Sequence, residues 1–237
     1  MKVAFLGMGN SLEQYVRHCA RHGSRELFDQ LWAVNSLASV FHVDLCWHMD
    51  DVRIQELRVA AGADDGPWVG EMLQWFKDHP EQPVVTSRAH PGYPGLIEYP
   101  LEFVLNATGG PAYFNGTPAY APALVYASHH PDSPIEPVTE FAIFGCDYAY
   151  APGIWKGEKG RGCMEYWLGR LHEQGKTVVK LPKETWLMDV NCLKPYGYDT
   201  VHPKITDENG RCKVVFEELP RDKWPSVRQI EERYAKR

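Results

Sequence analysis

The chain has 237 residues, 44% hydrophobic and 24% charged, which is ordinary for a globular protein with one large core. Its net charge of −6 gives no general attraction to nucleic acid, although Lys156, Lys159, Arg161 and Arg170 could form a local basic face. No apolar run reaches the roughly 18 residues of a membrane span, and the N-terminus turns glycine-rich too soon for a secretion signal. We therefore expect a cytoplasmic protein without a membrane partner, in the host cytoplasm if the chain is viral.

Three apolar runs near the N-terminus each end in a polar residue or a glycine turn. The runs VAFL, LWAV and VFHVDLCW lead to Gly9 and Asn10, to Asn35, and to Asp50. Ligands of open parallel sheets gather at the carboxyl ends of the strands, so these residues are expected to line one edge. A helix is expected between the first two runs, over Leu12–His22.

The rest of the chain continues the alternation of helices and strands. Helical spacing covers residues 52–76 with a break at 62–67, and QPVVTS is a strand. Residues 88–122, rich in Pro and Tyr, are expected to be a lid or substrate-binding insert, with a structural excursion as the alternative. A helix at TPAYAPALVYASHH, a strand at VTEFAIFGCDYAY, a helix at GCMEYWLGRLHEQG that ends at Gly175, and a strand at KTVVKLP follow.

This alternation predicts the fold class and the domain organisation. We expect an α/β protein with a Rossmann-like parallel sheet, helices on both faces and the Pro/Tyr-rich lid as an insertion. Residues 1–198 are expected to form a single nucleotide-binding domain. Residues 199–237 are expected to be a charged, irregular C-terminal extension, apart from a terminal helix at KWPSVRQIEERYAKR.

The six cysteines are scattered without a CxxC pair, which argues against both a zinc site and a disulfide framework. Cys46 and Cys146 lie in the apolar stretches VDLCW and AIFGCDY. We expect such thiols to be small hydrophobic groups of the core.

Several polar residues are candidates for a binding site. The turn GMGNS fits neither GxGxxG nor a Walker loop, but Asn10 and Ser11 can hydrogen-bond a phosphate, ribose or base there, or cap the next helix. Asp147 follows a strand where the fold needs no carboxylate, with a turn cap as the alternative. Arg161 begins the next helix and can hold a phosphate, with a solvated surface charge as the alternative.

The motif WHMDD leaves further alternatives open. Asp50 and Asp51 could ligate magnesium, or they could cap the helix that follows. His48 is a candidate general base, with a packed core histidine as its alternative. No Ser–His–Asp, Cys–His or paired-Glu arrangement is recognisable.

The segments FLGMGNSL, WAVNSL, FNGTPAYAPALVYA and EFAIFGCDYAY occur in an order that resembles a Rossmann-like superfamily. It comprises the bacterial sialyltransferases that use CMP-sialic acid, the motility accessory factors and the archaeal 6-hydroxymethylpterin diphosphokinases. The resemblance covers Lys2 to Leu187 and extends to uncharacterised phage and bacterial proteins of similar size.

The resemblance implies a nucleotide site at the residues that match the sialyltransferase motifs. These are Gly7, Gly9, Asn10, Ser11 and Asn35 for the donor nucleotide, Asn115, Gly116 and Thr117 at a turn before a helix, and Gly145, Asp147 and Tyr148 at a strand end. The chain departs from the family in its rearranged GMGNS turn, which has no proline before Ser11, and in GEKGRGC, which lacks the histidine base. Nucleotide binding, rather than sialic acid transfer, is therefore what the resemblance implies.

The leading hypothesis is a transferase with an activated nucleotide donor, namely a glycosyltransferase of phage origin with a CMP- or UDP-linked sugar. Its acceptor would be a glycan or a modified nucleobase. Asp50, His48 and Asp147 are the catalytic candidates, while Arg161 or Lys159 would neutralise the leaving group.

Two other functions are kept open. One is a magnesium-dependent diphosphokinase in which Asp50, Asp51 and Asp147 hold the metal ion. The other is a nucleotide-binding protein without catalysis. Assembly into a homo-oligomer is also left open.

Overall fold

The computed structural model describes residues 1–22, 27–63, 66–148, 155–183, 185–189, 201–208 and 211–218. The chain divides into two compact units, Met1–Asn191 and Cys192–Arg237. The first contains a seven-stranded sheet and the second a two-stranded sheet. In the described residues no helix combines the length and the apolar character that crossing a bilayer requires.

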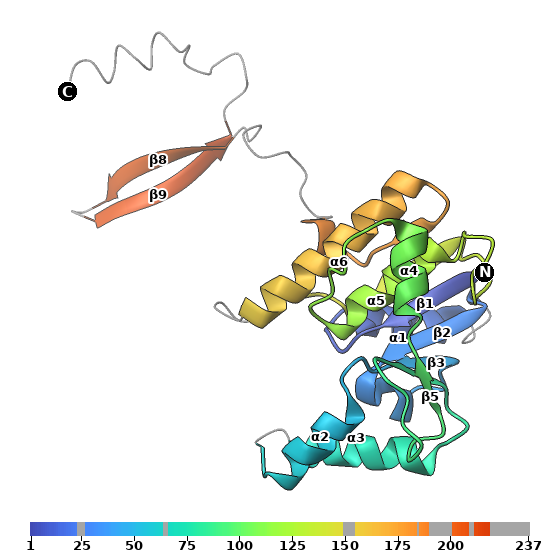
Figure 1. The fold of residues 1–237 in the computed structure, drawn as a ribbon. Helices are drawn as coiled ribbons and strands as arrows, with labels where there is room; N and C mark the ends of the chain where they lie inside the picture. Colours follow the sequence, from blue (N-terminus) through green and yellow to red (C-terminus); the bar gives the residue numbers. More distant parts are fainter. Residues whose placement is uncertain are drawn as a thin grey trace. The chain divides into compact units, whose positions relative to one another are not determined.

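The seven strands of the first unit are all parallel, in the order β5-β4-β3-β2-β1-β6-β7 (Figure 1). Their bounds are β1 Lys2–Leu6, β2 Gln30–Val34, β3 Leu45–Trp47, β4 Val84–Thr86, β5 Leu96–Glu98, β6 Glu140–Phe144 and β7 Val178–Lys180. From β1 the chain adds strands in one direction as far as β5, and β6 then pairs with the other side of β1. The strand order therefore reverses between β1 and β6, and the Rossmann-like α/β expectation is confirmed.

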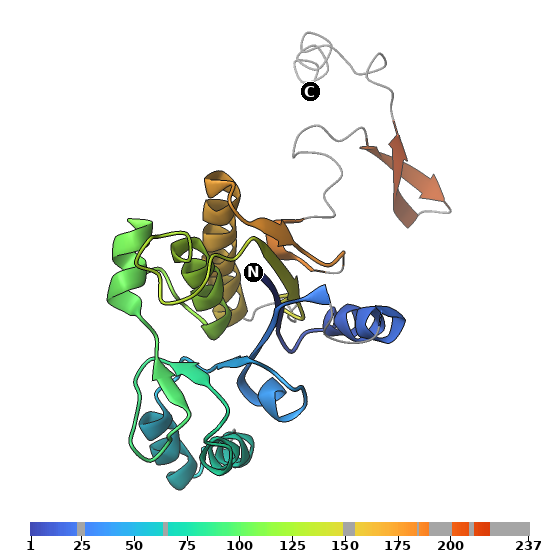
Figure 2. The ribbon, with the colours of Figure 1, turned by 90° about the vertical axis from the view of Figure 1, so that its right-hand side faces the viewer.

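Helices cover both faces of this sheet. Figure 2 shows α4, α5 and α6 together on one side, with α1 on the other. Their bounds are α1 Leu12–His22, α2 Val52–Ala60, α3 Gly66–Asp78, α4 Leu101–Thr108, α5 Tyr120–Ala127 and α6 Trp155–Gln174, with short 3₁₀ turns at η2 Asn35–Ser39, η3 Thr117–Ala119 and η4 Leu187–Asp189. Right-handed crossovers account for this division, because the chain reverses direction along the sheet after β5.

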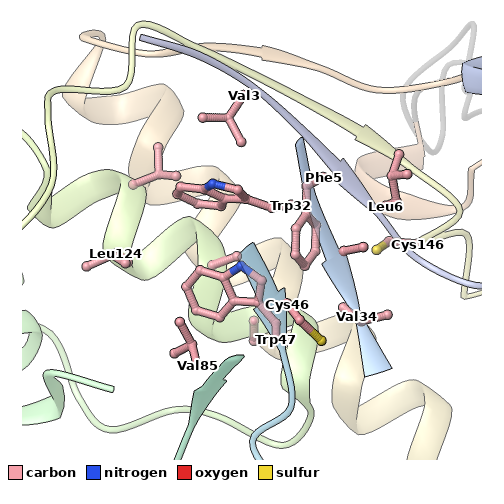
Figure 3. Packing of buried hydrophobic residues seen from close by; sticks show 14 of the residues in the cluster. Val3, Phe5, Leu6, Trp32, Val34, Cys46, Trp47, Val85, Leu124 and Cys146 are labelled. Atoms are coloured by element: carbon pink, nitrogen blue, oxygen red, sulfur yellow. The ribbon is translucent and has the colours of Figure 1, made fainter. Parts of the chain in front are cut away.

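The centre of the core is aromatic, as expected for parallel strands that are buried on both faces. Phe5 of β1 stacks on Phe141 of β6 with 5.7 Å between ring centroids, and Trp32 lies 5.4 Å from Trp47. Figure 3 shows Phe5, Trp32 and Trp47 side by side, with Leu124 of α5 close to them. These aromatic side chains fill the space between the sheet and α5, and they hold β1, β2, β3 and β6 together.

Two segments differ from the expectation. Residues 88–122 contain β5, α4 and η3, and β5 pairs with β4 as an edge strand. Much of this segment is therefore regular structure that connects β4 to β6. Its role as a lid stays a prediction. Helix α6 begins at Trp155, well before the expected Gly162, and ends as predicted at Gly175, whose φ is +67°.

The second unit contains a β-hairpin in a region that was expected to be irregular. β8 (Val201–Glu208) pairs antiparallel with β9 (Arg211–Glu218). The sequence Asn209-Gly210 between two β-rich runs is a strong hairpin signal that fits this pairing. The expected terminal helix at residues 223–237 lies outside the described residues.

Replacement of a core tryptophan tests this packing. We expect Trp47→Ala to lower the free energy of unfolding by about 3–5 kcal/mol, because Trp47 is fully buried and its removal leaves a cavity. Trp68→Ala is the matched control: Trp68 is 78% exposed, so the change should stay within about 0.5 kcal/mol. Urea denaturation measures both values, and equal losses would contradict the assignment of the core.

Candidate functional site

A pocket opens at the carboxyl ends of β1, β2 and β6, where the strand order reverses. Its volume of about 340 Å³ falls at the lower end of the range for small-molecule sites. It is lined by Gly7, Met8, Gly9, Asn10, Val34, Asn35, Thr117, Pro118, Gly145, Cys146, Asp147 and Tyr148. The loops after β1 and β2 thus meet in one pocket, as expected, and the loop after β6 joins them. Nucleotide binding by these loops stays a prediction.

Two glycine turns contact each other directly in the wall of this pocket. The Gly7 amide donates to the Phe144 carbonyl at 2.7 Å, and the Gly9 amide donates to the Gly145 carbonyl at 2.6 Å. A Cβ on Gly145 would lie 2.1 Å from the Gly7 carbonyl oxygen, and the φ of Gly145 is +71°. The contact between the turns therefore explains these glycines without a ligand.

Ser11 and Asp147 join the same two turns through side chains. The Asp147 carboxylate accepts a hydrogen bond from the Ser11 amide at 2.7 Å and another from the Ser11 hydroxyl. That hydroxyl in turn accepts from the Gly145 amide at 2.7 Å. Ser11 and Asp147 are only 1% and 4% exposed. We call these three groups the Ser11–Asp147–Gly145 clamp.

The clamp changes the electrostatics of the α1 N-terminus. Free amides at a helix start attract an anion, and in many α/β proteins that anion is a ligand phosphate. Here the Asp147 carboxylate already occupies that position. Asp147 therefore caps the turn that precedes α1, and it also lines the pocket, while its catalytic role stays a prediction.

Asn35 lies at the end of β2 in the left-handed conformation, with φ +51°. His48 Nδ1 lies 2.9 Å from Asn35 Oδ1, and His48 Nε2 lies 2.8 Å from Gln55 Oε1. Burial lowers the pKa of His48, against the opposing effects of the Gln55 hydrogen bond and the Asp50 charge. A neutral imidazole has one N–H, which can donate to only one of the two side-chain amides. The other ring nitrogen accepts, so either Asn35 or Gln55 must turn its NH₂ group toward the ring.

His48 is 1% exposed and is not part of the pocket lining. Both of its ring nitrogens are occupied by protein groups. This geometry favours a role in orienting Asn35 over direct proton transfer from a substrate. The general-base role of His48 stays an untested prediction.

The two adjacent carboxylates after β3 have different surroundings. Asp51 is the N-cap of α2, because its side chain accepts from the Arg53 amide at 2.9 Å. Asp50 is exposed and lies outside the pocket lining. Within the described ranges, no three His, Cys, Asp or Glu side chains come together in a way that could hold a metal ion.

The other candidates lie around the start of α6. Thr117 lines the pocket, whereas the Asn115 amide donates to Cys163 Sγ at 3.1 Å. Tyr148, also in the lining, packs against α6, since a Cβ on Gly160 would lie 3.1 Å from its ring. Arg161 pairs with Glu158 at 3.1 Å and is not part of the lining.

The structure thus separates the candidates into two groups. Those in the pocket are Gly7, Gly9, Asn10, Asn35, Thr117, Asp147 and Tyr148; those outside its lining are Ser11, His48, Asp50, Asn115, Gly116 and Arg161. Met8, Val34 and Pro118 also line the pocket but were not predicted, because apolar residues near a turn carry no sequence pattern that distinguishes a pocket wall from the core. Cys46 and Cys146 are buried as expected, and burial raises the pKa of Cys46 to about 12.

No protein-family model, curated protein or solved structure matches this chain. The pocket combines uncharged polar side chains, provided by Asn10, Asn35 and Thr117, with one carboxylate that already accepts hydrogen bonds from Ser11.

Removal of the Ser11 hydroxyl tests the clamp. We expect Ser11→Ala to lower the free energy of unfolding by about 1–3 kcal/mol, because the buried Asp147 carboxylate and the Gly145 amide each lose a partner. Ser39→Ala is the control, since Ser39 is exposed and bonds only locally to the Ser36 carbonyl. Chemical denaturation that gives equal stability for the two variants would contradict the clamp.

The environment of His48 predicts a pH dependence of stability. Its folded-state pKa is lowered from 6.5, so as the pH falls through about 6.5 the unfolded chain binds a proton that the native site does not. The free energy of unfolding therefore decreases on acidification. In urea titrations between about pH 7.5 and 5.5, His48→Gln should show a smaller decrease than the wild type. The exposed His42→Gln should keep the full decrease, and an unchanged slope in His48→Gln would refute the argument.

Proposed function

We propose that the chain is a cytoplasmic transferase that binds an activated nucleotide donor, specifically a nucleotide sugar, in the pocket at the β1–β6 reversal. The observation that carries the proposal is the convergence of the loops after β1, β2 and β6 on one pocket, which Asn10, Asn35 and Thr117 help to line. Doubly wound sheets bind nucleotides at such reversals. The amide side chains of Asn10 and Asn35 offer both donors and acceptors to the edge of a base or a ribose.

The clamp supports one orientation of the proposed nucleotide over the other. A phosphate at the start of α1 would face the Asp147 carboxylate, so the proposal puts the nucleoside there and the phosphates elsewhere. Gly160 packs against Tyr148 of the pocket, and Lys159 and Arg161 flank it in the sequence. We assign to these two side chains the neutralisation of the phosphate leaving group.

The acceptor hydroxyl needs a base, and Asp50 is our candidate. It is an exposed carboxylate directly after Met49, whose amide lies 3.4 Å from the Thr117 hydroxyl of the pocket. Burial raises the pKa of Tyr120, and electrostatic interactions with Cys163 and Asp50 raise it further. Asp50 therefore lies close enough to Tyr120, the first residue of α5, to interact with it electrostatically. The proposed acceptor is a glycan or a modified nucleobase, as in a phage decoration enzyme.

The diphosphokinase alternative receives less support from the geometry. It needs Asp50, Asp51 and Asp147 as magnesium ligands, but Asp51 caps α2 and Asp147 is bound to Ser11. Rearrangement of both carboxylates would be required before they could share a metal ion. The transferase therefore remains the better-supported proposal.

Nucleotide binding is tested by thermal unfolding with CMP, UDP, nucleotide sugars and ATP, each with and without magnesium. A ligand at about 100 times its dissociation constant adds about 2.7 kcal/mol of stability, so the melting temperature should rise. We expect Asn35→Ala to weaken the binding of the stabilising nucleotide about tenfold or more. Asn106→Ala, on the exposed face of α4, should bind as the wild type does.

The outcomes of this experiment separate the functions. Stabilisation by one nucleoside diphosphate and its sugar supports the transferase, and a shift with ATP and magnesium alone favours the diphosphokinase. Tight binding with the nucleotide sugar recovered intact, in the presence of candidate acceptors, favours a protein without catalysis. If no nucleotide changes the melting temperature, the nucleotide proposal fails.

A further inference from the structure

A second hollow lies between α1 and the β6–β7 side of the sheet, and it does not share a lining residue with the nucleotide pocket. Its volume is about 720 Å³. Among the residues that the structure describes, its charged lining consists of Lys2, Arg17, Arg21, Lys180, Lys183 and Glu140. We call this hollow the basic groove. Five Lys or Arg side chains in one groove are notable in a chain whose net charge is −6.

One wall of the basic groove is a single face of α1. Arg17, His18 and Arg21 follow Gln14 at helical spacing, so all four lie on one side of the helix. Arg17 and Arg21 are the two cations of this face, and Arg17 forms an exposed pair with Glu13 at 2.7 Å.

The opposite wall is formed by β7 and the residues that follow it. Lys180 pairs with Glu140 at 2.8 Å, which places this carboxylate beside a lysine. Lys183 lies farther along the same wall. The groove thus has cationic side chains on both rims.

The floor of the groove is apolar. It includes Phe28, Ala142, Phe144 and Leu181. Phe28 and Phe144 contact each other edge to face, with 6.4 Å between ring centroids, and both also pack against Tyr15. These rings are therefore packed together instead of standing free to stack on single-stranded bases.

The sheet beside the groove is incompletely covered. Lys180 pairs in register with Ala142, so it shares a face with the floor, and alternation puts Val178 on that face as well. Val178 is 60% exposed. Parallel sheets normally carry helices on both faces, so this face has the character of a surface on which a helix packs.

We propose that the basic groove docks an amphipathic helix of a partner protein, with an apolar stripe flanked by Asp and Glu. The apolar stripe would cover the floor, and the acidic flanks would meet Arg17 and Arg21 on one rim and Lys183 on the other. Helix-in-groove recognition uses this combination of apolar anchors and flanking charge. Residues 223–237 of the chain carry five Lys or Arg and two Glu, so their charge does not complement the groove.

The test uses the full chain and a fluorescent helical peptide of about 18 residues, with a Leu stripe flanked by Glu. We expect saturable binding that weakens with salt and falls about tenfold or more in the double variant Arg21→Glu/Lys183→Glu. Arg88→Glu is the control: it reverses an exposed charge outside the groove and should bind the peptide as the wild type does. Circular dichroism confirms that each variant is folded.

Two comparisons can overturn the proposal. Equal binding of a scrambled peptide of the same composition would show a non-specific response to acidic charge. Tighter binding of a single-stranded oligonucleotide, with the same loss in the double variant, would assign the groove to nucleic acid. The thermal shift produced by a nucleotide should be unchanged in the double variant, because the groove and the pocket have no lining residue in common.

Discussion

The contact between the turns after β1 and β6 is the constraint on which the site depends. Gly7, Gly9 and Gly145 allow the two backbones to touch, and the Asp147 carboxylate then holds Ser11 at the start of α1. Because β1 and β6 lie where the strand order reverses, this contact also determines where the sheet opens toward solvent. The shape of the pocket follows from a buried polar interaction that requires no ligand.

This interaction also limits the chemistry of the pocket. A helix start that already has a buried carboxylate on the Ser11 amide has little remaining attraction for phosphate. What the pocket offers instead are neutral hydrogen-bonding groups, among them Asn35, which His48 holds in place. Recognition of a base or a ribose fits such a surface better than recognition of a pyrophosphate does. The chain therefore uses a Rossmann-like sheet with a different distribution of charge.

Charge is distributed unevenly over the first unit. The chain as a whole is acidic, and the pocket at the β1–β6 reversal contains a buried carboxylate. Positive side chains gather instead on α1 and β7, around an apolar floor. The two hollows therefore differ in charge, which is why we propose different ligands for them. Both lie against β6, so its pairing with β1 and β7 supports each of them.

The sequence by itself determined the α/β class, most element positions and the polar residues at strand ends. These features follow from local periodicity, glycine turns and caps, which act over a few residues. It also contained the Asn209-Gly210 hairpin signal. Only the tertiary structure decided that Asp147 binds Ser11, 136 residues away in the chain, and that His48 turns toward Asn35 and Gln55. Such pairings depend on strand order and burial, because local spacing cannot specify which distant polar groups a buried side chain must satisfy.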